Sequence, residues 1–538
     1  MTDRSLGQPW RNPRSPRSWL IPGLCAGLAV LLAAPALIGL RTDAISTQRI
    51  LVDGVPITVM KPGVDGARPV VVIAHGFAGS AVIMGALAEQ VTKAGAIAVT
   101  FDFVGHGANA TPMSAGGGMS EAGQAALAAD LDTVVRWIAG QPGVDVEQLA
   151  LVGHSMGAGA VVRYAVEHPT KVRSVVAISL PSAAVIPAQM PAVPPNLLLL
   201  VGSAEPASFT AAALAGLQSG YPAGKFEQLY GNASAGTLRS AQVIAGSEHV
   251  GIVFAPATAA AATRWLADTL VNDADQPTLQ VPSDATNTLV WLAMLLVAGV
   301  LAMVPIARVL YPHPAASDLQ RWRVVARIIA VVAVAVIAAD IVAWFLQGVT
   351  DHLPLAVGGY LASWFTTAGV VMLVLLRWLP SPPFIRQNPA IGLGDLVRAL
   401  VSATVVVLLI AVPSTLTWAP FALVGARWWL ALVMLIAFTV FFWGEERLLR
   451  NLTTGRRWTA VLLDRVLVVA GLLAAIPVLG APGFLILLLP LMVLLLFLLA
   501  GFAGIVARRN GGFLGAVLVQ SVPLALLSAT TFPLLVAT

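Results

Sequence analysis

The chain has 538 residues, of which 58% are hydrophobic and only 11% are charged, and its formal net charge is +5. Soluble globular proteins carry about 25% charged residues, so much of this chain cannot face water. Its arginines lie at the ends of apolar runs rather than in one basic patch, which indicates membrane topology and argues against a nucleic-acid partner. The single cysteine, Cys25, excludes an internal disulfide and a cysteine-based metal cluster.

The first forty residues have the order of a membrane anchor. Residues 1–18 are basic and are predicted to form a cytoplasmic N-terminus. Residues 19–40 are uncharged and long enough to cross a bilayer, which needs about 20 apolar residues. A basic segment followed by an apolar run is also typical of a secretion signal, but the length of this run favours an uncleaved signal anchor.

Residues 41–275 contain most of the acidic residues and are predicted to form a water-exposed domain. In this domain, short runs rich in β-branched residues alternate with helix-like segments. The predicted strands are 68–76, 96–103, 148–153, 172–180, 196–202 and 242–246, and the predicted helices are 120–140, 156–167 and 255–272. This alternation predicts an α/β fold with a parallel sheet, in which ligands bind at the carboxyl ends of the strands.

A predicted linker, 276–287, leads into a second apolar region, 288–538, which we expect to be an all-α membrane domain of eight spans. The expected spans are 288–310, 325–347, 357–378, 396–418, 427–444, 460–479, 483–506 and 512–536. Together with 19–40, they make about nine spans in the whole chain.

Arginine positions predict how these spans are oriented, because cytoplasmic loops collect Lys and Arg. The loops predicted to be inside contain Arg321, Arg323, Arg377, Arg386, Arg447, Arg450, Arg456, Arg457, Arg508 and Arg509. The loops predicted to be outside, near 348–356, 419–427 and 479–483, contain only Arg427. We therefore expect a multi-pass cell-membrane protein with its N-terminus inside, its C-terminus outside and the domain 41–275 extracytoplasmic.

The expected spans place the ionisable residues Asp340, Asp464 and Arg465 inside the membrane. Such residues are costly in a membrane and often functional. For Asp464 and Arg465 we favour the simpler interpretation that they pair with one another near the cytoplasmic end of their span.

Within the domain 41–275, the run Gly153-His154-Ser155-Met156-Gly157 has the G-x-S-x-G pattern of a nucleophile elbow. By itself this pattern is weak evidence in a chain with 48 glycines. Here, however, it follows an apolar strand directly and opens a helix of small residues, which is the setting that the elbow requires. Gly153 and Gly157 let the strand and the helix approach closely. Ser155 is therefore the predicted nucleophile.

A nucleophilic serine needs a base, and in this arrangement the acid and then the histidine follow the serine along the chain. Only His168 and His249 lie between Ser155 and the end of the domain. His168 ends the helix that begins at Ser155, far from the nucleophile, whereas His249 follows the last predicted strand. We expect His249 to be the base.

The choice of acid falls among glutamates, because no aspartate occurs from 146 to 249. Glu205 follows the strand 196–202 by three residues and can point toward a histidine on the neighbouring exit loop. Glu167 is at a helix end, Glu227 lies in a polar excursion, and Glu248 adjoins the base. Glu205 is the predicted acid, with the role of orienting the imidazole and stabilising its cation.

An oxyanion hole needs two backbone N–H groups aimed at the developing charge. Met156, directly after the nucleophile, is expected to supply one, and Phe77, in the glycine-flanked loop after the first predicted strand, the other. His75 has no partner ligands at metal-binding spacing, so we interpret it as a structural hydrogen-bonding residue. The predicted chemistry requires neither a metal nor an organic cofactor.

Residues 68–275 resemble the α/β-hydrolase superfamily of serine esterases and lipases. The resemblance is carried by HGFAGS (75–80), DFVGHG (102–107), GHSMG (153–157), VGSAEP (201–206) and SEHVGI (247–252). It implies a triad of Ser155, Glu205 and His249, with Phe77 and Met156 as oxyanion donors, and a structural role for Asp102 and His106. The chain departs from the superfamily in lacking a sizeable cap, so we expect an open site covered only by the glycine-rich loop 109–123.

A second motif lies in the membrane region. Residues 445–450, EERLLR, fit the EExxxR motif of intramembrane CAAX-type proteases. Those enzymes also need histidines on later helices, and no histidine follows His352. We therefore interpret the motif as an ion-paired cytoplasmic helix end.

Together these observations predict a membrane-anchored serine hydrolase that cleaves an ester or related acyl bond. Because the site is near a bilayer, its substrate is expected to be a small-molecule or lipid-like ester, and membrane lipids are expected partners. Two alternatives stay open: an acyltransferase with the same triad, and a transporter or scaffold whose hydrolase-like domain only binds a ligand.

Overall fold

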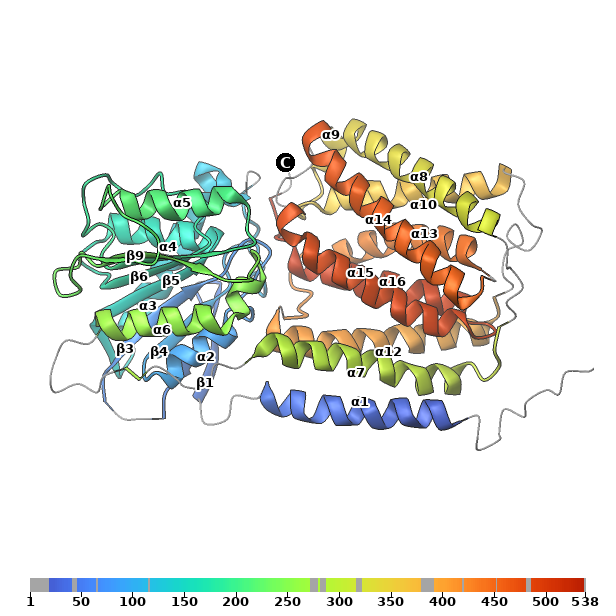
Figure 1. Cartoon of the computed structure of the whole chain (residues 1–538), viewed down its shortest axis with the longest axis horizontal. Coiled ribbons are helices and arrows are strands. Elements are labelled where there is room, and N and C mark those ends of the chain that lie inside the picture. Colours follow the sequence, from blue (N-terminus) through green and yellow to red (C-terminus); the bar gives the residue numbers. More distant parts are fainter. Residues whose placement is uncertain are drawn as a thin grey trace, which may run out of the picture.

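Figure 1 shows the computed structural model of the chain. The structure describes residues 19–40, 46–63, 66–114, 117–270, 279–280, 287–315, 322–378, 391–418, 420–450, 452–479 and 485–536. The predicted basic segment 1–18 and most of the predicted linker 276–287 lie outside these residues.

The α/β part is built on one nine-stranded sheet with the order β1-β2-β4-β3-β5-β6-β7-β9-β8. Its strands are β1 (Ser46–Val52), β2 (Val55–Lys61), β3 (Arg68–Ala74), β4 (Ile97–Phe101), β5 (Val144–His154), β6 (Ser174–Ile178), β7 (Leu197–Gly202), β8 (Leu229–Tyr230) and β9 (Arg239–Ile244). From β4 to β9 in this order, neighbouring strands are parallel. The predicted parallel α/β fold is confirmed.

Helices cover both faces of the sheet, which explains why the central strands are apolar runs without alternation. On one face lie α3 (Glu121–Ala139), α4 (Met156–Glu167) and α5 (Ala207–Gln218), and on the other α2 (Gly85–Lys93) and α6 (Pro256–Leu270). Strands β1 and β2 form an antiparallel hairpin, and β2 also pairs antiparallel with β4. This hairpin was not predicted. Most side chains of β1 are exposed, so this strand has no apolar pattern that would reveal it.

Among the described residues, nine helices are long and apolar enough to cross a membrane. They are α1 (Leu20–Gly39), α7 (Thr288–Leu310), α8 (Trp322–Phe345), α10 (Gly358–Trp378), α12 (Leu393–Thr417), α13 (Arg427–Leu449), α14 (Thr454–Leu479), α15 (Leu485–Ala507) and α16 (Phe513–Thr531). The expected number of spans is thus confirmed by length and composition, although individual ends differ by several residues.

The α/β domain lies against one end of this helix bundle (Figure 1). The hydroxyl of Ser80 donates to the backbone oxygen of Trp418, at the end of α12, over 2.9 Å. The last span, expected to reach residue 536, instead ends at Thr531, and the chain continues in extended form. Segment 532–536 then pairs with both parts of the protein: Met113 N–H donates to Leu534 O over 2.9 Å, and Ala356 N–H to Pro533 O over 2.9 Å.

Arg427 was the exception to the arginine pattern, and the structure gives the reason. Its side chain is fully buried at the start of α13 instead of facing water. The guanidinium donates to Gly105 O over 2.7 Å, to Phe532 O over 2.8 Å, and to Ala529 O. Because these carbonyls belong to the α/β domain, segment 532–536 and α16, Arg427 connects three separate elements at the junction.

We expect Arg427→Met to destabilise this junction. The methionine keeps the apolar stem but removes every donor, and hydrogen bonds to charged groups stabilise by about 1.5–3 kcal/mol each. The midpoint of thermal unfolding in detergent should fall by about 5 °C or more. Arg136→Met, which removes exposed contacts with Asp132 and Thr133, is the control and should change the midpoint by less than about 1 °C. Equal midpoints for the two variants would contradict the role given to Arg427.

The ionisable residues inside the bundle are paired. Arg465 contacts Asp464, as expected, and its Nη1 also lies 2.9 Å from Glu445 Oε1. Glu446 accepts from Arg457 over 2.6 Å. Asp340 accepts from the indole N–H of Trp364 over 2.7 Å. The EERLLR run therefore lies in an ion-paired region, in line with its structural interpretation.

Candidate active site

The turn between β5 and α4 places Ser155 in a strained conformation. Ser155 has φ +52° and ψ −116°, in the left-handed region that side chains rarely adopt. Its N–H donates to Ile178 O on β6 over 2.9 Å. A Cβ on Gly153 would lie 2.3 Å from Gly157 O, and one on Gly157 would lie 2.5 Å from His75 O. Both glycines are therefore required by close backbone contacts, which is the geometry expected of a nucleophile elbow.

Ser155 lies within hydrogen-bond distance of the predicted base. Its Oγ is 3.0 Å from His249 Nε2. His249 follows β9 and is buried against the ring of Phe209, with 4.6 Å between the ring centroids. The backbone oxygen of His249 accepts from His154 Nε2 over 2.9 Å. The loop that carries His249 is thus attached to the residue that precedes Ser155.

Glu205 lies on the other side of the imidazole. Its Oε1 is 3.6 Å from His249 Nδ1, and its side chain is fully buried. This separation is longer than a hydrogen bond, but contacts of this kind commonly shorten when substrate binds. The hydroxyl of Ser179 donates to the same oxygen over 2.5 Å. The structure therefore brings together all three residues of the predicted triad.

Ser179 was not identified from the sequence. It directly follows β6, and its neighbour β7 leads to Glu205, so both side chains reach the same edge of the sheet. Its φ of +54° is a second strained angle at this edge. A polar residue directly after a central parallel strand was the signal that could have identified it.

The other candidates for acid and base lie elsewhere. The carboxylate of Glu248 accepts from Val250 N–H over 2.8 Å and from Gly251 N–H over 2.5 Å. Glu227 accepts from Val243 N–H over 2.7 Å. Glu167 and His168 are at the far end of α4, where the ring of His168 lies against Tyr164. In the described part of the chain, no hydrogen bond or ion pair joins any of these side chains to the ring of His249.

We expect Glu205→Gln to lower kcat by about 10²–10⁴-fold, because the neutral amide no longer stabilises the imidazolium or selects its tautomer. The measurement is hydrolysis of a soluble ester by the full-length protein in detergent. Glu227→Gln is the matched control, since this exposed carboxylate on the same domain should be replaceable with less than a twofold change. Similar activities for the two variants would show that Glu205 does not act on His249.

The loop after β3 lies directly against the elbow. A Cβ built on Gly76 would be 3.2 Å from Ser155 Cβ, so the backbone of this loop is in contact with the nucleophile. Phe77 lines the same pocket as Ser155, and Met156 begins α4 immediately after it. The structure thus places the predicted oxyanion donors on the two backbone segments beside Ser155.

Three buried histidines around the site have structural partners. His75 accepts from Phe103 N–H over 3.1 Å, and its Nδ1 donates to Gly76 O over 2.8 Å. Burial lowers the pKa of His75 to about 4 and that of His154 to about 3, and it also lowers the pKa of His106 well below its usual value. These rings are neutral at pH 7 and hold loops in place, as expected for His75 and His106.

Asp102 connects the loops after β3 and β4. Its carboxylate accepts from Ala81 N–H over 2.6 Å and from Ala108 N–H over 2.8 Å. Burial raises the pKa of Asp102 to about 6, although both hydrogen bonds favour its ionised form. Asp102 thus has the structural position that the family resemblance implied.

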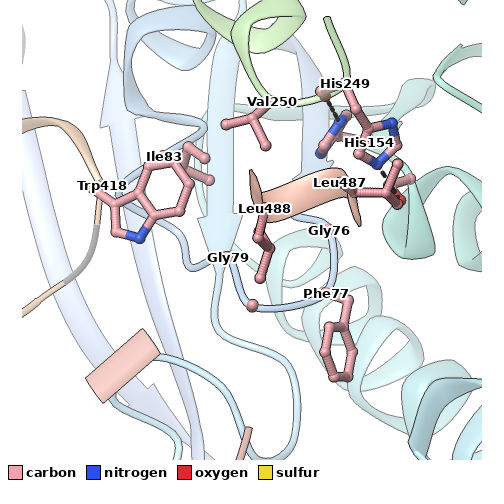
Figure 2. A pocket seen from close by; sticks show the side chains of 12 residues that line it. Gly76, Phe77, Gly79, Ile83, His154, His249, Val250, Trp418, Leu487 and Leu488 are labelled. Carbon is pink, nitrogen blue, oxygen red and sulfur yellow. Dashed lines mark hydrogen bonds between the residues drawn. The ribbon is translucent and has the colours of Figure 1, made fainter. Parts of the chain in front are cut away.

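The expectation that only loop 109–123 covers the site is wrong. The pocket at Ser155 is lined by Trp418, at the end of α12, and by Leu487 and Leu488, in the first turn of α15, whereas no described residue of 109–123 lines it. Figure 2 shows these three side chains beside Gly76, Phe77 and His249. These three residues could not be identified from the sequence because they come from the membrane region, more than 160 residues from His249.

Among the described residues, no cluster of His, Cys, Asp and Glu suited to a metal ion is found.

The family comparison concerns the α/β domain. Residues 65–214 match the model of the family described as "Serine aminopeptidase, S33". Two uncharacterised proteins from strains of Mycobacterium tuberculosis are each 35% identical over 104 residues, which cover 19% of this chain and 34% of each relative. The chain therefore spans about a third of the length of the curated relatives it matches.

Solved structures of hydrolases also align with less than half of the chain. A dienelactone hydrolase from Anabaena variabilis is 18% identical and covers 42% of this chain and 100% of its own, with a TM-score of 0.32. An esterase from Pyrobaculum calidifontis is 14% identical and covers 47% of this chain and 96% of its own, with a TM-score of 0.31. The family match, the parallel sheet and the elbow at Ser155 lead to one conclusion: this chain contains an α/β-hydrolase domain of the serine-hydrolase type.

Proposed function

We propose that the protein is a membrane-anchored serine hydrolase that cleaves an ester bond at the extracytoplasmic face. The observation that carries this proposal is the 3.0 Å distance between Ser155 Oγ and His249 Nε2. A serine hydroxyl becomes a useful nucleophile only when a base accepts its proton, and this contact supplies the base. Glu205, buried on the Nδ1 side of the ring, provides the charge that an imidazolium requires.

In the proposed reaction, Ser155 Oγ attacks the ester carbonyl carbon while His249 Nε2 accepts the hydroxyl proton. The resulting oxyanion accepts hydrogen bonds from the N–H groups of Phe77 and Met156. His249 then returns the proton to the departing alcohol oxygen, and the C–O bond of the ester breaks. In the second half, water attacks the acyl-Ser155 ester, again losing its proton to His249, and the acid and free Ser155 are released.

The extracytoplasmic location is supported by where arginines lie along the helices. The α/β domain lies at the end of the bundle that contains the C-terminus of α12 and the N-terminus of α13. At the opposite end lie Arg308, Arg377, Arg398, Arg447, Arg450, Arg456, Arg457, Arg508 and Arg509. Because arginine is retained on the cytoplasmic side, this end is the inner one in our proposal.

A fluorophosphonate probe applied to the full-length protein tests the enzyme proposal. The wild-type protein should become labelled and Ser155→Ala should not. The protein should hydrolyse simple esters. Amino-acid amides are tested beside them, because the description of the matched family names a peptidase. Absence of labelling on folded protein would favour a scaffold, and cleavage of amides without esters would contradict the ester assignment.

The single cysteine makes the location directly testable. In a Cys25→Ser background, Ser234→Cys places a thiol on an exposed loop of the α/β domain, and Thr454→Cys places one at the opposite end of the bundle. A membrane-impermeant maleimide should label the first variant in intact cells and the second only after permeabilisation. The reverse pattern would place the α/β domain inside the cell.

A further inference from the structure

The pocket at Ser155 is too small to hold most substrates. It encloses about 40 Å³. A single water molecule needs roughly 10–15 Å³ of cavity volume, so this pocket has room for about three groups of the size of a water molecule. It therefore fits a reacting carbonyl and the atoms next to it. The rest of a substrate must occupy an adjoining space.

A second cavity lies among the helices of the bundle and is partly open. Its volume is about 190 Å³, and its walls come from α7, α10, α12, α13, α15 and α16. Among the described residues that line it, none carries a charge, and only Ser414, Thr417, Ser528 and Thr531 carry hydroxyls. The Thr417 hydroxyl donates to Pro413 O of its own helix over 2.7 Å. The other linings are hydrophobic, so this space suits a hydrocarbon and offers no site for a charged headgroup.

The two spaces share walls. Trp418 and Leu488 line both the pocket at Ser155 and the cavity within the bundle. Trp418 is held toward the α/β domain by the hydrogen bond from Ser80 to its backbone oxygen. Figure 2 shows both side chains beside the pocket that contains His249. A hydrocarbon chain that extends past these two residues would connect the cavity among the helices with the nucleophile.

One face of α15 follows the cavity away from the site. Leu488, Leu491, Met492 and Leu495 are spaced at three and four residues, which places them on one side of a helix, and all four line the cavity. Ile486, in the same turn as Leu488, lines neither space and is 48% exposed on the outer surface of the bundle. The helix thus offers both a cavity-lining position and a matched outward position for substitution.

We propose that the cavity within the bundle binds the hydrocarbon chain of the substrate, and that the substrate is therefore a long-chain ester taken from the membrane. The hydrocarbon chain of the substrate lies among α7, α12, α15 and α16. The ester group of the substrate extends past Trp418 and Leu488 to reach Ser155. This inference rests on the proposed function, because it identifies the substrate class for the same nucleophile.

Met492→Trp tests the inference by filling the cavity about one turn of α15 beyond Leu488. Full-length protein in nanodiscs is assayed with ethyl acetate, ethyl octanoate and octyl acetate. The variant should lower the ratio of kcat/KM for a long ester to that for ethyl acetate by about tenfold or more, since single methylene contacts in apolar pockets already change specificity about tenfold. Ile486→Trp is the control and should leave the ratio within twofold.

The two long esters distinguish which side of the scissile bond enters the cavity. Loss of ethyl octanoate alone places the acyl chain there, and loss of octyl acetate alone places the alcohol chain there. Substrate partitioning into the nanodisc is the same for wild type and variants, so it cancels in the comparison. Unchanged ratios for both esters, in a variant that still labels with fluorophosphonate, would overturn the cavity inference and leave the proposed function intact.

A second variant covers the case in which the tryptophan prevents folding. Met492→Ala enlarges the cavity, and its assay adds two longer substrates, dodecyl acetate and ethyl dodecanoate. The variant should raise the ratio of kcat/KM for dodecyl acetate to that for octyl acetate, or for ethyl dodecanoate to that for ethyl octanoate, according to which chain enters the cavity. An unchanged ratio would count against the inference. If wild-type protein neither labels nor cleaves ethyl acetate, the proposed function itself has failed, and this result is recognisable before any variant is made.

Discussion

Replacing Ser155 with alanine is expected to lower kcat by about 10⁴-fold or more on every ester that the wild-type protein cleaves. The substitution removes the only atom that can form the acyl intermediate, and members of a triad act as one unit. His249 would keep its position, because its backbone oxygen is bonded to His154 and its ring lies against Phe209. Turnover of a soluble ester by the purified full-length protein is the measurement.

The fold should survive this change. Ser155→Ala removes one hydroxyl and no buried apolar group, so the midpoint of thermal unfolding should stay within about 2 °C. Ser182→Ala, in the exposed loop after β6, is the matched control and should retain full activity. A Ser155→Ala protein with more than about one hundredth of wild-type activity would show that another residue is the nucleophile.

Gly157→Ala is expected to reduce both stability and activity. A Cβ at this position would lie 2.5 Å from His75 O and 2.6 Å from Ala74 O, and backbone atoms cannot rotate away as a side chain can. The start of α4 must therefore move away from β3, and Ser155 and the Met156 N–H move with it. A displacement of about 1 Å at a reacting group can cost about 10²-fold in rate, so we expect kcat to fall by that order.

Gly159→Ala is the control for this prediction, because it adds the same methyl group two residues later on the same helix. The nearest atom to its Cβ would be Pro181 Cγ at 3.9 Å, an ordinary contact. Alanine in a helix is more stable than glycine by about 0.5–1 kcal/mol, so the unfolding midpoint should stay level or rise. The two variants are compared by thermal unfolding, followed by circular dichroism, and by ester turnover. Equal unfolding midpoints and equal turnover would contradict the steric explanation.

Much of the catalytic site could be predicted because the carboxyl ends of parallel strands meet at one edge of a sheet. Ser155, Glu205 and His249 follow β5, β7 and β9, and each was identified by its position after an apolar run. Ser179 follows β6 in the same way but was missed, since serine after a strand is too common to single out. The apolar helices could also be predicted, because an apolar run and the arginines beside it are visible within one short stretch of sequence.

What could not be predicted depends on contacts between distant segments. Trp418 and Leu488 have no local pattern that marks them as walls of a pocket. They acquire that role only because α12 ends, and α15 begins, where the α/β domain is attached. Segment 532–536 is apolar and was therefore assigned to the last span, although its pairing with Met113 draws it out of the helix. Arg427 was the one visible clue, as an arginine on the side where arginine is otherwise absent.

The pairing of segment 532–536 also implies an order of events during synthesis. Domains fold as units in the order in which they are made, so residues 46–270 can form their sheet before the eight later spans exist. The backbone hydrogen bonds that join Gly105 and Met113 to Leu534 and Val536, however, can form only after the last of those helices has been made. The elbow at Ser155 can therefore form early in synthesis, whereas the pocket walls that Trp418 and Leu488 provide are added later.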